Sequence, residues 1–138
     1  MTLLTRAAPF FEDHLPMTVV EQKDGRFVTT IEFTDYHLNA AGSVHGGMIL
    51  CALDVAIAGG GAAGVNNGKD VYGITLTINC NFVAAAPPGL ARCEAEIVGG
   101  GKSTKFVDAR MLSPDGDIYA TASGTVRVIP LKAGDEKA

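Results

Sequence analysis

Residues 45–58, His-Gly-Gly-Met-Ile-Leu-Cys-Ala-Leu-Asp-Val-Ala-Ile-Ala, decide the fold of this chain. From Met48 to Ala58 the run is apolar on every side of a helical wheel, which is typical of a helix buried all round. Asp54 alone is charged, and a carboxylate in apolar surroundings is costly unless it has partners or a task. Gly46 and Gly47 lie in the first turn, where backbone N–H groups lack intrahelical partners and carry the positive end of the helix dipole. An uncovered N–H cluster near a buried acid indicates chemistry at a carbonyl group.

Strand signals lie on both sides of this helix. Upstream, a short helix limited by Pro9 is expected over residues 3–14, followed by a hairpin. The hairpin strands are Met17 to Gln22 and Arg26 to Phe33, joined by the turn Lys23-Asp24-Gly25. Downstream, the helix is expected to decay into the glycine run at 59–61. Four strand candidates then follow, over residues 72–83, 90–98, 103–112 and 117–129.

The connections between these strands are short, which favours an antiparallel sheet. In the segment 72–83, side chains alternate between two faces, so that Ile78 and Thr75 are expected to point in opposite directions. An all-apolar helix needs cover on every side. We therefore expect the sheet to curl around the helix and a second subunit to supply the remaining cover.

Length and composition limit the possible classes of protein. The 138 residues, 47% of them hydrophobic, predict one globular domain over residues 1–138 with a charged tail from about residue 131. The net charge of −4 gives no support for nucleic-acid binding. No apolar run of about 18 residues and no signal peptide are recognised, so no membrane partner is expected. Three cysteines without metal-ligand spacing predict reduced thiols, no metal site and a cytoplasmic location.

A longer motif contains the helix start. Asn39 and Gly42 precede His45-Gly46-Gly47, Asp54 follows seven residues after Gly47, and Thr75 opens the next strand. This pattern resembles the hot-dog fold thioesterases of the phenylacetate-degradation (PaaI-like) and 4-hydroxybenzoyl-CoA thioesterase type. The resemblance runs from about residue 26 to residue 128.

The resemblance implies both a fold and an activity. The fold is of the α+β class, with a curved antiparallel β-sheet wrapped around one long central helix. The implied activity is hydrolysis of an acyl-CoA or aryl-CoA thioester to carboxylate and CoA, without a metal or organic cofactor. The sequence departs from the family at Ala84-Ala85-Ala86, where a cation is often found, and at Lys102, where Arg is common. Both departures affect the contacts to the CoA phosphates more than the chemistry.

The motif residues have both functional and structural interpretations. Asp54 is expected to attack the thioester carbonyl or to activate water, and the sequence does not choose between these roles; the alternative is a structural acid. The Gly46 N–H is expected to receive the carbonyl oxygen as negative charge develops. Asn39 positions the thioester or the water if the resemblance holds, and otherwise makes an Asx turn. His45 is expected to orient the loop and contact the ligand, and Thr75 to hydrogen-bond Asp54 or the water.

Further residues complete the expected site. Gly47, Lys102 and Lys105 are candidates for substrate binding, with a solvated strand face as the alternative for the two lysines. Cys51, one turn before Asp54, is expected to be a core thiol because no basic partner lowers its pKa.

The spacing along the helix predicts a shared site. Gly46 and Asp54 are separated by roughly 12 Å of axial rise, too far for both to reach one thioester group. If two such helices lie antiparallel across a two-fold axis, the acid of one comes beside the N-terminus of the other. We therefore expect a homodimer with two shared sites, and two dimers pairing into a homotetramer.

Two other functions remain open at this level. A hot-dog module could bind acyl-CoA without hydrolysing it, because an intact site does not prove turnover. A hot-dog dehydratase or hydratase would need a His and an acid placed for proton transfer, and the spacing from His45 to Asp54 does not match that arrangement.

Overall fold

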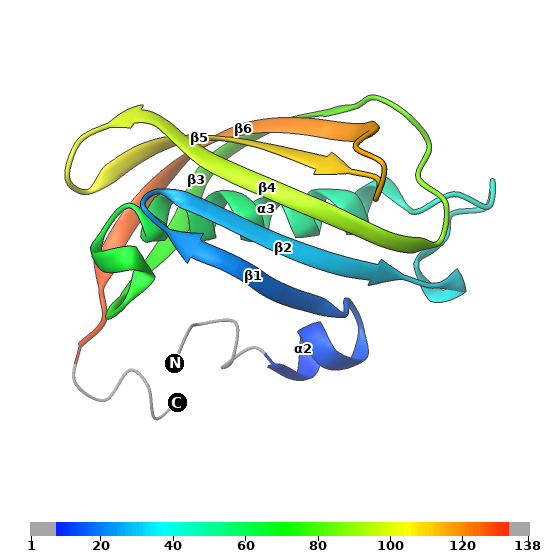
Figure 1. Cartoon of the computed structure of the whole chain (residues 1–138), viewed down its shortest axis with the longest axis horizontal. Helices are drawn as coiled ribbons and strands as arrows, with labels where there is room; N and C mark the ends of the chain where they lie inside the picture. Colours follow the sequence, from blue (N-terminus) through cyan, green and yellow to red (C-terminus); the bar gives the residue numbers. More distant parts are fainter. Residues whose placement is uncertain (1–7, 133–138) are drawn as a thin grey trace.

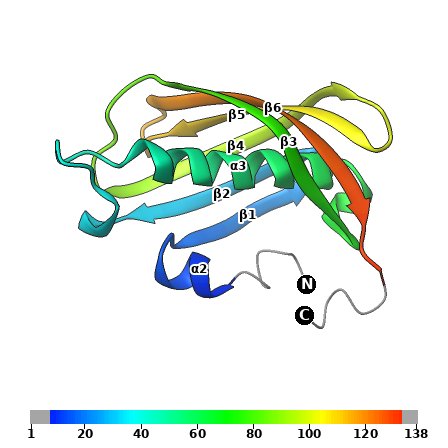
Figure 2. The same cartoon turned by 180° about the vertical axis from the view of Figure 1, so that it is seen from behind.

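One long helix lies against a single curved sheet of six strands (Figures 1 and 2). The computed structural model describes residues 8–132, so part of the helix expected over 3–14 and most of the charged tail lie outside the described residues. The elements are α2 (Ala8–Asp13), β1 (Met17–Lys23), β2 (Arg26–Phe33), the 3₁₀ turn η1 (Asp35–His37), α3 (Gly46–Ala63), the 3₁₀ turn η2 (Asn66–Gly68), β3 (Val71–Phe82), β4 (Gly89–Gly100), β5 (Thr104–Leu112) and β6 (Ile118–Pro130).

The strand order is β1-β2-β4-β5-β6-β3, and every neighbouring pair is antiparallel. The expected antiparallel sheet wrapped around one central helix is thus confirmed. Strand β3, which follows the helix in the chain, crosses to the edge beside β6. Its outer backbone edge has no partner strand within residues 8–132, which leaves it open to another chain.

Helix α3 continues five residues beyond the point where the sequence predicts its decay. The glycine run at 59–61 is helical, and the helix ends at Ala63. A Cβ atom on Gly59 would lie 2.6 Å from the ring of Phe27, and one on Gly61 would lie 2.7 Å from Val126. Because these glycines lack a side chain, β2 and β6 approach the helix backbone directly. Tertiary packing therefore outweighs the low helix propensity of glycine here.

The sheet of the single chain covers only part of α3, and the second subunit expected to supply the remaining cover stays a prediction. The sheet covers one face of α3, including Ile49, Leu53 and Ile57, and leaves the opposite face open (Figure 2). Asp54 lies on this open face and is exposed. Helix α3, with 18 residues and a mean hydropathy of 1.6, is long and apolar enough to cross a membrane. This differs from the expectation that the sequence contains no apolar run of about 18 residues. Half of it is buried in this fold, as is usual for the core helix of a globular domain.

Strand β3 departs from the predicted alternation. A bulge lies between Thr75 and Thr77, so the two residues do not follow the regular pleat. Leu76 and Phe82, which a regular alternation would put on the same face as Ile78, are each 55% exposed in the single chain. Thr75 and Ile78, expected on opposite faces, line the same hollow beside α3.

Candidate active site

The start of α3 leaves one backbone N–H group free. His45 is the N-cap, and its Nδ1 accepts a hydrogen bond from the Gly47 N–H at 2.8 Å. The His45 carbonyl accepts the Met48 N–H at 2.9 Å and the Ile49 N–H at 3.2 Å. Within the described residues, the Gly46 N–H has no hydrogen-bond partner. The Gly46 N–H, which is expected to donate a hydrogen bond to a carbonyl oxygen, is therefore free. It lies at the positive end of the helix dipole.

The ring of Phe82 packs against this helix start. A Cβ atom on Gly46 would lie 3.3 Å from the Cε1 and Cζ atoms of Phe82. The glycine thus keeps the space beside the free N–H open, and the ring forms one wall of that space. The sequence does not indicate this contact, because nothing in the spacing shows that the end of β3 returns to the start of α3.

Asn39 holds the loop that leads into the helix. Its Oδ1 accepts the backbone N–H groups of Ala41 at 2.9 Å and Ser43 at 3.2 Å, and its Nδ2 lies 3.1 Å from the Ser43 Oγ. The Leu38–Val44 bridge closes the base of the loop. The Asx-type interpretation of Asn39 is therefore what the single chain shows, and a direct contact with substrate stays a prediction.

Asp54 lies in an open hollow between α3 and β3. The hollow has a volume of about 400 Å³ and is lined by Gly47, Leu50, Cys51, Asp54, Thr75, Leu76, Thr77 and Ile78. Within the described residues, the Asp54 carboxylate makes no hydrogen bond or ion pair. The Thr75 Oγ1 is buried without a hydrogen-bond partner. A buried hydroxyl that lacks a partner is uncommon in native proteins. The hollow thus brings together a free carboxylate and an unsatisfied hydroxyl, and the expected hydrogen bond of Thr75 to Asp54 or to water stays a prediction.

Gly46 and Asp54 do not meet within one chain. Both lie on α3, eight residues apart, which is roughly 12 Å along the helix axis. Gly46 does not line the hollow that holds Asp54. One chain therefore presents two half-sites at separate points of the same helix.

Cys51 lines the hollow, and the reactivity of its thiol is low. Burial raises the pKa of its thiol, and the nearby charge of Asp54 raises it further. Because the thiolate is the nucleophilic form, Cys51 is a poor nucleophile. The expected core thiol is thus half-buried, at the edge of the core and in the lining of the hollow.

The two lysines lie away from the free N–H of Gly46. Lys102 and Lys105 belong to the β4–β5 hairpin, at the end of the sheet where Ile97 packs against Gly64 beyond the C-terminal end of α3 (Figure 1). The structure brings neither lysine into the hollow of Asp54. Among residues 8–132, no group of three or more His, Cys, Asp or Glu side chains could hold a metal ion.

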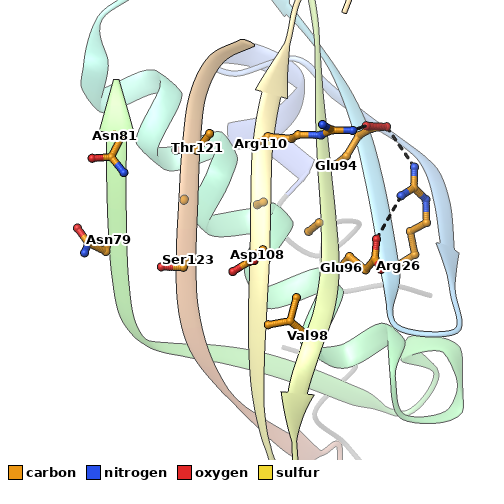
Figure 3. A pocket seen from close by; sticks show the side chains of 13 residues that line it. Arg26, Asn79, Asn81, Glu94, Glu96, Val98, Asp108, Arg110, Thr121 and Ser123 are labelled. Atoms are coloured by element: carbon orange, nitrogen blue, oxygen red, sulfur yellow. Dashed lines mark hydrogen bonds and ion pairs between the residues drawn. The ribbon is translucent and has the colours of Figure 1, made fainter. Parts of the chain in front are cut away.

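A second hollow, of about 520 Å³, lies on the face of the sheet away from α3 (Figure 3). Its charged groups are mostly paired with one another. Glu94 is the central acceptor, at 3.1 Å from Arg26, 3.2 Å from Arg92 and 3.4 Å from Arg110. Burial favours the neutral form of Glu94, but the Arg92 hydrogen bond and the charges of the three arginines outweigh it and lower its pKa. The arrangement is that of a structural ion-pair network.

Comparison with known proteins agrees with this fold. A family model of the thioesterase superfamily matches residues 41–120, more than half of the chain. The chain belongs to the thioesterase superfamily, and the expected enzyme class, a thioester hydrolase, is confirmed.

Individual relatives cover most of the chain. It is 25% identical over 117 residues to a 1,4-dihydroxy-2-naphthoyl-CoA hydrolase from Listeria monocytogenes, covering 85% of this chain and 94% of the relative. A solved thioesterase from Staphylococcus aureus has a TM-score of 0.76 and 26% identity, covering 91% of this chain and 99% of that one. The E. coli PaaI protein from the phenylacetic acid degradation operon has a TM-score of 0.74 and 20% identity, covering 93% and 95%. The hot-dog fold predicted from the sequence is thereby confirmed.

Proposed function

We propose that this chain hydrolyses an acyl-CoA or aryl-CoA thioester to carboxylate and CoA, in a site shared between two copies of the chain. The observation that carries the proposal is the pair of half-sites on α3. A free Gly46 N–H begins the helix, and an unpartnered Asp54 lies eight residues further along. Each half-site needs a partner that its own chain does not supply.

The chemistry follows from these two groups. The thioester oxygen accepts a hydrogen bond from the Gly46 N–H, which stabilises the negative charge that develops as the carbonyl carbon is attacked. If Asp54 is a general base, it takes a proton from water while the water oxygen adds to the carbonyl carbon. If Asp54 is a nucleophile, its carboxylate adds instead, and water later hydrolyses the resulting anhydride. In both routes the C–S bond breaks and the CoA sulfur leaves as a thiol.

Thr75 fits either route as a positioning residue. Its buried hydroxyl has no partner in the single chain, and it shares the hollow with Asp54. A water molecule or the Asp54 carboxylate would satisfy this hydroxyl.

Two relatives and the lining of the hollow support a CoA thioester as substrate. The Listeria relative is a hydrolase of an aryl-CoA. A hypothetical thioesterase protein from Streptococcus pneumoniae, with a TM-score of 0.71 and 22% identity, has a crystal structure with coenzyme A. The hollow of Asp54 is walled largely by apolar side chains, including Leu50, Leu76 and Ile78, which suit an acyl or aryl group.

The shared site is supported by the surfaces that the single chain leaves open. The edge strand β3 exposes Ile74, Leu76 and Phe82, and the face of α3 that carries Asp54 is also open. An apolar strand edge beside an open helix face is suited to pairing with a second copy. In an antiparallel pair, the β4–β5 hairpin of the copy that gives Asp54 points toward the helix start of the other. Lys102 and Lys105 would then approach the CoA phosphates from that side.

The proposal is tested by measuring thiol release from phenylacetyl-, hydroxyphenylacetyl-, benzoyl- and medium-chain acyl-CoA. We expect release of free CoA with at least one of these, and none above background with Asp54→Asn. Tight binding of acyl-CoA without thiol release would favour the non-catalytic module. Hydration of an enoyl-CoA by the wild type, without thiol release, would favour the hydratase.

A further inference from the structure

The ring of Phe82 lies beside the Gly46 N–H, next to the space that a bound thioester must enter. A Cβ atom on Gly46 would lie 3.3 Å from the Cε1 and Cζ atoms of this ring. In a helix, both the Cα–Cβ bonds and the first N–H groups point toward the N-terminus. The ring therefore borders the path along which a carbonyl oxygen reaches the Gly46 N–H.

The backbone that carries this ring is held to the sheet. Phe82 is the last residue of β3 and pairs with Ala120 of β6. The next two N–H groups, of Val83 and Ala84, both donate to the Tyr119 carbonyl, at 2.8 Å and 3.1 Å. The end of β3 thus stays beside β6 and keeps the ring at the start of α3.

The same segment is also bonded to the loop that precedes α3. The Ala86 carbonyl accepts the Val44 N–H at 2.8 Å, and both of these residues are buried. Val44 lies two residues before Gly46, and Ala86 lies four residues after Phe82. A hydrogen bond in the core therefore ties the ring and the N–H to each other, so that neither moves independently.

A second ring borders the next residue of the helix. A Cβ atom on Gly47 would lie 3.0 Å from the Nδ1 atom of His45 and 3.3 Å from its Cε1 atom. The hydrogen bond from the Gly47 N–H to Nδ1, at 2.8 Å, orients this imidazole. Flat side chains thus lie beside both of the first two helix residues, and a group bound at the Gly46 N–H meets the Phe82 ring on one side.

Simple geometry shows which part of a thioester comes near the ring. An oxygen bonded to the Gly46 N–H lies about 2.9 Å from the nitrogen, so its carbonyl carbon lies about 4 Å away. The Cβ position of Gly46 is about 2.5 Å from the same nitrogen, and the ring begins 3.3 Å beyond it. The carbon next to the carbonyl is therefore within contact range of the ring. An unbranched or planar carbon fits there, whereas a branched one presses an alkyl group against the ring.

We propose that Phe82 is a specificity-determining residue, which selects thioesters whose carbon next to the carbonyl is unbranched or planar over those branched at that carbon. The inference rests on the proposed function, because it narrows the substrate class of the same site. The contact arises as the carbonyl binds the Gly46 N–H, so it affects kcat/KM for each substrate.

The test uses two matched pairs of thioesters. Hexanoyl-CoA and 2-ethylbutanoyl-CoA are isomers that differ in branching next to the carbonyl. Benzoyl-CoA is planar at that carbon, and cyclohexanecarbonyl-CoA is branched there. We expect the wild type to favour the first member of each pair by about 10- to 100-fold in kcat/KM. In Phe82→Ala this ratio should fall by about 10-fold, and in Phe82→Leu by less.

The control is Phe106→Ala, which removes a ring of similar exposure from β5, outside the hollow of Asp54. It should keep the wild-type ratio. Phe82 is 55% exposed, so Phe82→Ala removes no core side chain and should fold. Each ratio compares two substrates of one variant, so a general loss of active protein lowers both rates and leaves the ratio unchanged.

Binding distinguishes failure of this inference from failure of the proposed function. Dissociation constants of the four thioesters are measured for Asp54→Asn and for Asp54→Asn/Phe82→Ala. If the wild type releases no thiol, a binding preference that disappears without the ring would support the role of Phe82 and contradict the hydrolysis. Thiol release with equal ratios in wild type and Phe82→Ala would overturn the role of Phe82 and leave the proposed function intact. A protein that neither binds nor hydrolyses any of the four would contradict both.

Discussion

Asp54 is the residue on which the proposed chemistry depends most directly. Because its carboxylate makes no hydrogen bond or ion pair within residues 8–132, replacing it by the isosteric amide removes no stabilising contact of the single chain. We expect Asp54→Asn to fold with an unchanged melting temperature and to lose about 100- to 10,000-fold in kcat. Thiol release and thermal unfolding measure the two effects. The matched control is Asp108→Asn, an exposed acid on the other face of the sheet, which should behave as wild type. A kcat near wild type for Asp54→Asn would remove this residue from the mechanism.

Gly46 is the second residue of the site, and its lack of a side chain leaves the N–H open to the carbonyl oxygen. In Gly46→Ala the added Cβ lies 3.3 Å from the ring of Phe82, which is half exposed and can move by the few tenths of an ångström required. The variant should therefore fold, while the methyl group hinders the approach of the carbonyl oxygen to the N–H. We expect kcat to fall by about 100- to 1,000-fold, with a smaller change in KM.

The control for this variant is Gly101→Ala, because a Cβ there would meet no atom within 4 Å. It should retain wild-type kinetics. If Gly46→Ala raises KM and leaves kcat unchanged, the glycine only shapes the pocket.

At the residue scale, the sequence predicts what depends on local spacing. Gly46 and Asp54 could be assigned to one helix and to separate half-sites because helix geometry turns spacing into distance. The burial of His37 could not be predicted, since its bond to the His14 carbonyl joins positions 23 residues apart. The wall that Phe82 forms beside Gly46 was hidden for the same reason. The exposure of Asp54 in the single chain was missed because a helical wheel shows which faces are apolar and not what covers them.

At the scale of elements, the glycines of α3 determine how closely the sheet packs. In an exposed helix, Gly→Ala stabilises by about 1 kcal/mol. In Gly61→Ala the new Cβ would lie 2.7 Å from the Cγ1 of Val126, a branched side chain in the core. We expect this overpacking to outweigh the propensity gain and to lower the free energy of unfolding by about 1–3 kcal/mol. Denaturant unfolding gives the value. In a Val126→Ala background, Gly61→Ala should lower the free energy of unfolding much less. An equal loss in both backgrounds would show that contact with Val126 does not cause the destabilisation.

The ion-pair network around Glu94 should make the stability of the sheet depend on pH. Burial alone would raise the pKa of Glu94, but the Arg92 hydrogen bond and the charges of Arg26, Arg92 and Arg110 lower it below 4.5. A carboxyl group with a lowered folded-state pKa adds stability above its unfolded-state pKa and loses it as the pH falls through the folded-state value. We expect Glu94→Gln to be less stable than wild type by about 1–2 kcal/mol at pH 7. The difference should shrink as the pH falls below 4.5.

A neighbouring glutamate supplies the control for this measurement. Glu96 is 68% exposed and lies 3.8 Å from Arg26, so Glu96→Gln should change stability by less than about 1 kcal/mol. If wild type and Glu94→Gln differ in free energy of unfolding by the same amount at pH 3 and pH 7, the charge of Glu94 does not stabilise the sheet through this network.

The elements themselves were largely predictable because their signals are local. The hairpin of β1 and β2, and strands β4, β5 and β6, lie within a few residues of the ranges that alternation and turn residues predict. The continuation of α3 through the glycine run was not predictable from propensity, since contacts with Phe27 and Val126 decide it. The bulge between Thr75 and Thr77 has no signal in the alternating sequence, although it places Thr75 in the hollow of Asp54.

At the scale of the whole molecule, the central claim is that two copies complete each site. The single chain leaves one face of α3 and the edge of β3 open, and it separates Gly46 from Asp54 by roughly 12 Å. A two-fold axis that sets two such helices antiparallel gives each dimer two equivalent sites. When molecular mass in solution and thiol release are measured on the same sample, no active monomer should therefore be found.

The most direct test mixes two inactive variants, Asp54→Asn and Gly46→Ala, under conditions that exchange subunits. At equal amounts half of the dimers are mixed, and each mixed dimer carries one doubly altered site and one intact site. The account predicts recovery to about a quarter of wild-type activity. As a converse control, wild type mixed equally with the double variant Asp54→Asn/Gly46→Ala should fall to about a quarter if sites are shared, and to about half if each chain holds its own. No recovery in the first mixture, with subunit exchange shown by mass, or full activity in an isolated monomer, would contradict the shared site.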